Sequence, residues 1–159
     1  MQKEVEPNQP ASRPWHEFKH WQSLSDGFLV SIVVVGPTFL FSELWRGKPL
    51  IDRGPSLWVP AALIMAAGFF AGGAIAGRHR STAKGAFNQG ILVAGLTLTL
   101  IFLADMIRRI VLGQDIYWSV LGYWVAATAA GLLLSGLAGV CGRIQTVRAV
   151  KRSRMNRFF

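Results

Sequence analysis

The sequence predicts an all-α membrane protein with four transmembrane helices, and three observations support this. Of its 159 residues, 52% are hydrophobic and only 16% are charged. The charged residues avoid four long apolar windows, at 27–42, 57–77, 86–104 and 116–142. With their flanks these windows reach the roughly 20 residues that a helix needs to cross a hydrocarbon core of about 30 Å. Basic residues gather in alternate connections between the windows, as in multi-pass membrane proteins.

Three parts are expected along the chain. The tail 1–26 has aromatic and leucine residues at helical spacing, which predicts an interfacial amphipathic helix. The tail 143–159 is basic and is expected to form a helix along the headgroups. The four-helix transmembrane domain lies between them at 27–142, with spans at about 27–45, 57–77, 86–107 and 116–142.

The first and third spans end in similar charged sequences. Glu43 and Arg46 stand three residues apart, and Asp105 and Arg108 have the same spacing. Both pairs are predicted to be interfacial ion pairs, each worth about 1 kcal/mol or less. The first span also contains Gly36–Pro37, which is expected to kink or break its helix because proline lacks a backbone N–H.

Small residues at helical spacing mark the second and fourth spans. Such residues let helix backbones approach closely in lipid, where no hydrophobic effect drives association. Both stripes are therefore predicted to be helix-packing or partner-contacting surfaces. Their members are Gly68, Gly72, Gly73 and Gly77 in the second span, and Ala127, Gly131, Ser135 and Gly139 in the fourth.

The chain can be read as two similar hairpins. Residues 28–46 resemble 91–108, and residues 58–78 resemble 124–143. Both hairpins would enter the membrane from the same side, which corresponds to a parallel repeat. Because membrane helices draw on few residue types, chance similarity and true duplication both stay open.

The distribution of basic residues predicts the orientation. The two tails and the middle connection hold 12 of the 17 lysine and arginine residues, whereas the other side holds 5. By the positive-inside rule both termini are cytoplasmic, and the expected location is a bacterial inner membrane. Anionic lipid contacts are expected for Arg143, Arg148, Lys151 and Arg152. The single cysteine, Cys141, is interpreted as a small packing residue, with palmitoylation as the alternative.

The motifs of common enzyme classes do not occur in the sequence. It contains no phosphate-binding loop, nucleophile elbow, H-E-x-x-H or C-x-x-C motif. His16, His20 and His79 have no acidic or cysteine partners at ligand spacing. The sequence therefore predicts no catalytic residues, no metal, no cofactor and no nucleic-acid partner.

The segment Gly72–Arg78, followed by a short basic loop and by Gly85 and Gly90, resembles small four-helix membrane proteins of bacteria, several of them from actinobacteria. The resemblance covers the two central helices and rests on glycine-rich packing. It implies a fold only and carries over no functional residue.

These observations lead to a functional expectation with one main alternative. The first is a non-catalytic accessory or assembly subunit of a larger inner-membrane complex, such as lipid-transport or respiratory machinery. The alternative is a small homo-oligomeric four-helix transporter, which the Gly36–Pro37 break and the repeat would favour. A membrane enzyme ranks third.

Overall fold

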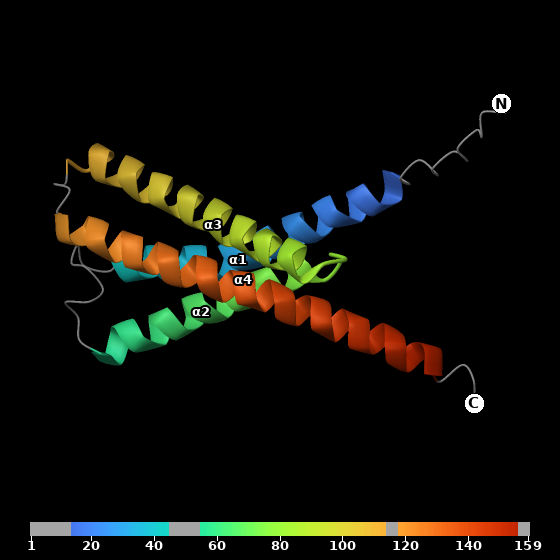
Figure 1. The fold of residues 1–159 in the computed structure, drawn as a ribbon. Coiled ribbons are helices and arrows are strands. Elements are labelled where there is room, and N and C mark those ends of the chain that lie inside the picture. The colour runs from blue at the N-terminus through green and yellow to red at the C-terminus, as the bar shows by residue number, and fades with distance from the viewer. Residues whose placement is uncertain (1–13, 45–54, 114–117, 156–159) are drawn as a thin grey trace, which may run out of the picture.

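A computed structural model describes residues 14–44, 55–113 and 118–155. Within these ranges the chain forms four α-helices and no strand (Figure 1). All four are long and apolar enough to cross a membrane, which confirms the predicted all-helical class with four candidate spans. The helices are α1 (Pro14–Leu44), α2 (Pro55–Gly77), α3 (Ala83–Val111) and α4 (Trp118–Met155).

The first helix is longer than the sequence analysis expected. The predicted interfacial helix and the first span are a single helix of 31 residues, which continues through Pro37. The expected break at Gly36–Pro37 is therefore absent. Pro14 lies in the first turn of α1. A backbone N–H at this position would have no intrahelical acceptor, so proline, which has no N–H, costs the helix no hydrogen bond there.

Local signals explain the bounds of α3. The Thr82 side chain accepts a hydrogen bond from the Gly85 N–H at 3.1 Å, which caps the N-terminus. At the other end Gly113 has φ 60°, a left-handed conformation that glycine adopts without strain and that ends a helix.

The last helix also exceeds its predicted span. α4 runs for 38 residues, a length of about 57 Å, so the expected span and most of the basic tail form one continuous helix. Its C-terminal part extends beyond the other three helices (Figure 1).

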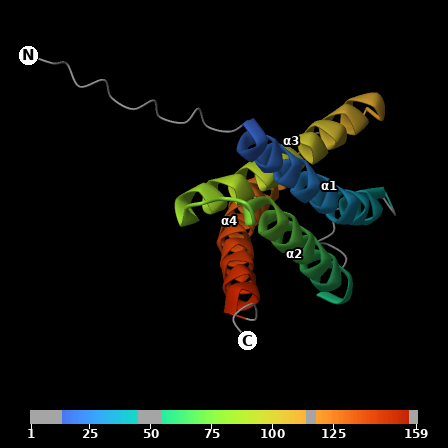
Figure 2. The ribbon, with the colours of Figure 1, turned by 90° about the vertical axis from the view of Figure 1, so that its right-hand side faces the viewer.

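The helices cross at a common waist and diverge towards their ends (Figures 1 and 2). α2 and α3 pack against each other, and each also packs against both α1 and α4. The small apolar core comprises Val35, Phe69, Ala94, Leu98 and Ile101.

Candidate functional site: the helix-packing surfaces and the Asp105 cluster

Glycines bring α2 and α4 into backbone contact. A Cβ atom added to Gly73 would collide with the Ser135 carbonyl, and one added to Gly77 would collide with the Gly139 carbonyl. Real Cβ atoms do not approach other heavy atoms so closely, so a larger residue at either position would force the helices apart.

The other two helices approach in the same way. A Cβ atom added to Gly90 of α3 would also collide with the Ser135 carbonyl, and the Ser135 hydroxyl donates a hydrogen bond to the Gly90 carbonyl at 2.8 Å. On α1, a Cβ atom added to Gly27 would lie 2.5 Å from the Gly72 carbonyl oxygen. We call the residues at these crossings the glycine waist: Gly27, Gly72, Gly73, Gly77, Gly90, Ser135 and Gly139.

The predicted packing residues are thus used between helices of the same chain. Seven of the eight are buried, and only Ala127 is exposed. Because backbone or side-chain atoms of this chain already fill their small faces, the buried seven are not accessible to another protein. The seven are Gly68, Gly72, Gly73, Gly77, Gly131, Ser135 and Gly139.

The hairpins α1–α2 and α3–α4 make equivalent contacts. A Cβ atom added to Gly68 would meet Val35, and one added to Gly131 would meet Leu98. Likewise, Gly27 approaches the carbonyl of residue 72 and Gly90 that of residue 135. Each counterpart lies 63 positions later (98 − 35, 131 − 68, 90 − 27, 135 − 72). The equivalence does not extend to the whole bundle, because α2 packs on α3 whereas α4 and α1 make few contacts.

A polar network ties α1, α3 and the α2–α3 connection together beside the waist. The Arg80 Nε–H donates to the side-chain amide oxygen (Oε1) of Gln89, and the Gln89 side-chain N–H donates to the His20 backbone carbonyl at 3.0 Å. Gln89 is 2% exposed, so these bonds lie within the protein.

Arg143 joins α4 to the same connection. Its guanidinium donates twice to the Ser81 carbonyl, at 3.1 and 2.7 Å. Of the four residues predicted to contact anionic lipid, Arg143 therefore has a partner within the protein, whereas Arg148, Lys151 and Arg152 are exposed.

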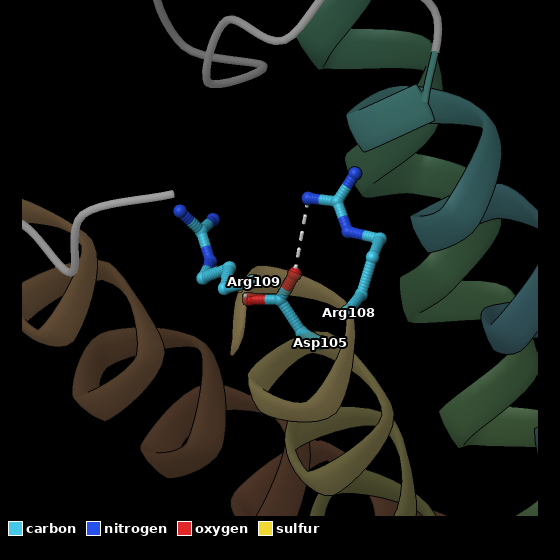
Figure 3. A network of polar contacts seen from close by, with 3 residues as sticks. All are labelled: Asp105, Arg108 and Arg109. Atoms are coloured by element: carbon cyan, nitrogen blue, oxygen red, sulfur yellow. Dashed lines mark hydrogen bonds and ion pairs between the residues drawn. The ribbon is translucent and has the colours of Figure 1, made fainter. Parts of the chain in front are cut away.

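The Asp105 carboxylate bonds to two arginines at the opposite end of α3. Figure 3 shows Asp105 with Arg108 and Arg109 and marks the contact with Arg108. One oxygen lies 3.2 Å from Arg108, the predicted partner, and the other lies 2.9 Å from Nε of Arg109. Arg109 was not among the predicted ion-pair residues, although its i, i+4 spacing from Asp105 signals such a contact. We call these three residues the Asp105 cluster.

The environment of this cluster differs from the expected exposed interface. Asp105 is 2% and Arg109 is 7% exposed, because both lie on the face of α3 that also carries the core residue Ile101. An ion pair buried in protein is sensitive to loss of one partner in a way that a solvated pair is not. The other predicted pair cannot be compared, since the Glu43 side chain and all of Arg46 lie outside the described residues.

The hydroxyls of Thr97 and Ser31 are buried without a partner among the described residues. The Trp124 ring packs against Phe39 and Phe102, with centroids 5.0 and 5.3 Å away. Cys141 is exposed, which contradicts its interpretation as a small packing residue.

A second set of small residues on α4 faces away from the bundle. Gly122, Ala126 and Ala130 follow one another at four-residue spacing, and all three are exposed. A Cβ atom added to Gly122 would meet nothing within 4 Å. At 100° per residue they lie on the side away from Trp124, the residue through which this part of α4 packs on Phe39 and Phe102. We call these three residues the exposed small row.

Within the part of the chain that the structure describes, no three His, Cys, Asp or Glu side chains gather in a way that could hold a metal ion. No family model, curated protein or solved structure matches the chain. The resemblance to small four-helix bacterial membrane proteins stays a prediction.

Proposed function

We propose that the chain is a non-catalytic integral membrane subunit that assembles with other membrane proteins in a bacterial inner membrane. The observation that carries this proposal is the exposed small row on α4. Lipid-transport and respiratory complexes are the two proposed classes of host.

Transmembrane helices associate in lipid through close packing of their backbones. Small residues four positions apart on one helix face allow this close approach. The glycine waist offers nothing to a partner because it is occupied within the chain. The exposed small row is the matching surface that remains open, and it would accept one transmembrane helix of another subunit.

The proposal can be tested by placing leucine in the row. Gly122→Leu and Ala126→Leu should release the partner subunits during purification from native membranes, because leucine keeps the two backbones apart. The unfolding temperature of the isolated protein should not fall, since no atom lies within 4 Å of a Cβ at Gly122 and replacing a glycine inside a helix favours the helix. Ala104→Leu, at an exposed position on α3, is the matched control and should retain the partners. Retention by the row variants would contradict the proposal.

The proposed topology has both termini in the cytoplasm, supported by the 12 to 5 distribution of basic residues. Reporter fusions at residue 159 and within 47–56 would test it. An externally accessible C-terminus would reverse the orientation.

A small homo-oligomeric transporter is the second candidate, and two observations favour it. The hydroxyls of Ser31 and Thr97 are buried without partners in the described ranges, and Asp105 is buried in a helix long enough to span the membrane. Polar groups in such positions often line substrate paths. Flux by the purified protein in liposomes that Asp105→Asn abolishes would favour this candidate over the subunit.

A further inference from the structure

We infer that the C-terminal part of α4, residues 144–155, is an arm that binds a surface of anionic phospholipid headgroups. We call this segment the α4 arm. The inference requires a membrane-inserted bundle but is independent of which protein partners or substrates the chain has.

The α4 arm begins where α4 leaves the bundle. The last close contacts of α4 are those of Gly142, whose added Cβ would collide with the Ala74 carbonyl, and of Arg143 with the Ser81 carbonyl. No proline or glycine follows within the helix, so α4 continues without a break to Met155. The α4 arm is therefore held in a fixed direction by the bundle, about 18 Å past its last contacts.

One side of the α4 arm carries both apolar and cationic residues. At 100° per residue, Ile144, Val147 and Val150 fall within one third of the circumference, and their exposed fractions are 39, 56 and 49%. Lys151 falls inside this arc and Arg148 lies 40° past its edge, both exposed. The opposite side holds one cation, Arg152, among the neutral residues Gln145, Ala149 and Ser153.

Such a mixture suits a lipid headgroup layer. Apolar side chains can enter the boundary with the acyl chains while long cationic side chains reach back to the phosphates. A second copy is an unsuitable occupant, because residues 143–159 contain six basic residues and no acidic one, so two arms repel. A protein groove that receives a helix takes a continuous apolar face, which Lys151 interrupts.

The surroundings at this end of the bundle have the same sign. Lys19, Arg78 and Lys84 are exposed there, and Asp26 is the one exposed acidic side chain in the described part of α1 and the α2–α3 connection. The net positive charge attracts an anionic surface over about a Debye length of 8–10 Å.

Full-length protein in vesicles can test the inference. In a Cys141→Ser background, Val147→Cys places a fluorescent label on the side that carries Ile144 and Val150, and Ala149→Cys places the same label on the opposite side as the matched control. In vesicles containing phosphatidylglycerol, the label at 147 should shift to the blue and be quenched by spin-labelled lipid. Neither change should occur in pure phosphatidylcholine, and the label at 149 should stay solvent-exposed in both.

One further variant and one change of conditions make the result specific. Arg148, Lys151 and Arg152 changed together to Gln should abolish the response at 147, as should high salt. A response that is equal in the two lipids, or equal at 147 and 149, would overturn the inference. So would a label at 147 that stays exposed in phosphatidylglycerol vesicles but is protected in native membranes, because a protein would then be the occupant.

Discussion

The two hairpins share a steric framework but differ in polar content. Positions 63 apart make the same close contacts in α1–α2 and in α3–α4, through Gly27 and Gly90 and through Gly68 and Gly131. Polar residues do not follow this equivalence. Thr97 is buried in α3, whereas the residue 63 positions earlier is Val34. The comparison shows that close helix crossing requires small residues at fixed spacing and leaves other buried positions free to diverge. Polar residues found in only one hairpin are therefore the better candidates for what is specific to this protein.

The largest expected effect comes from the Asp105 cluster in the second hairpin. Its predicted counterpart in the first hairpin, the pair Glu43 and Arg46, has no described side-chain contacts. Asp105→Asn removes the carboxylate charge that contacts both Arg108 and Arg109, in a site where Asp105 is 2% and Arg109 is 7% exposed. Losing one partner of a buried pair costs about 3–5 kcal/mol. Reversible unfolding in mixed micelles, followed by tryptophan fluorescence, would measure it. Arg108→Gln is the control and should cost less, because the Arg109 contact remains. Equal, small losses would mean that the cluster behaves as a solvated surface pair.

The second prediction tests whether the two hairpins are sterically equivalent. Gly27→Ala and Gly90→Ala each force a Cβ atom against a facing carbonyl, so each should destabilise the fold by about 1–3 kcal/mol. Gly95→Ala is the control within α3, since its Cβ would meet only Leu132, at 3.9 Å. It should stabilise the helix by about 0.5–1 kcal/mol through helix propensity. A loss at Gly90 without one at Gly27 would break the equivalence.

The sequence predicted the number and approximate positions of the helices better than it predicted their lengths. Hydropathy located four helices, and α2 ends at Gly77 as expected. The helices α1 and α4 are longer than the expected spans, which were ended where polar residues begin. Helical hydrogen bonds do not depend on side-chain polarity, and no glycine or proline stops α4 after Gly142.

The candidate site was predictable in part for a similar reason. Periodicity showed which helix faces carry small residues, but it does not say which helix lies on each face. Gly77 and Ala127 therefore looked alike, although one packs on Gly139 and the other is exposed. Asp105 is buried because it lies on the face of α3 that also carries core residues. Its position near the end of the span had instead suggested an exposed ion pair at the membrane interface.

A smaller effect is expected at Ser135, which stands where the first hairpin has Gly72. Ser135→Ala removes the hydroxyl that donates to the Gly90 carbonyl at 2.8 Å. The expected loss is about 1 kcal/mol, the net value of a typical intramolecular hydrogen bond. The same unfolding assay applies. No loss would mean that the Gly90 carbonyl is satisfied within its own helix and that the crossing depends on steric fit alone.

The smallest expected effect is at Thr97, where Thr97→Val gives α3 the residue that α1 carries at the equivalent position. The two side chains have nearly the same shape, so the change removes a hydroxyl without opening a cavity. Because this hydroxyl is buried without a partner among the described residues, its removal should leave stability unchanged or raise it by up to about 1 kcal/mol. Ser135→Ala is the matched comparison, since there a bonded hydroxyl is lost. A clear loss of stability in Thr97→Val would show that the hydroxyl is bonded in the membrane, to water or to a polar solute. The second hairpin would then contain a hydrated position that the first lacks, and the transporter would gain over the subunit as an account of this chain.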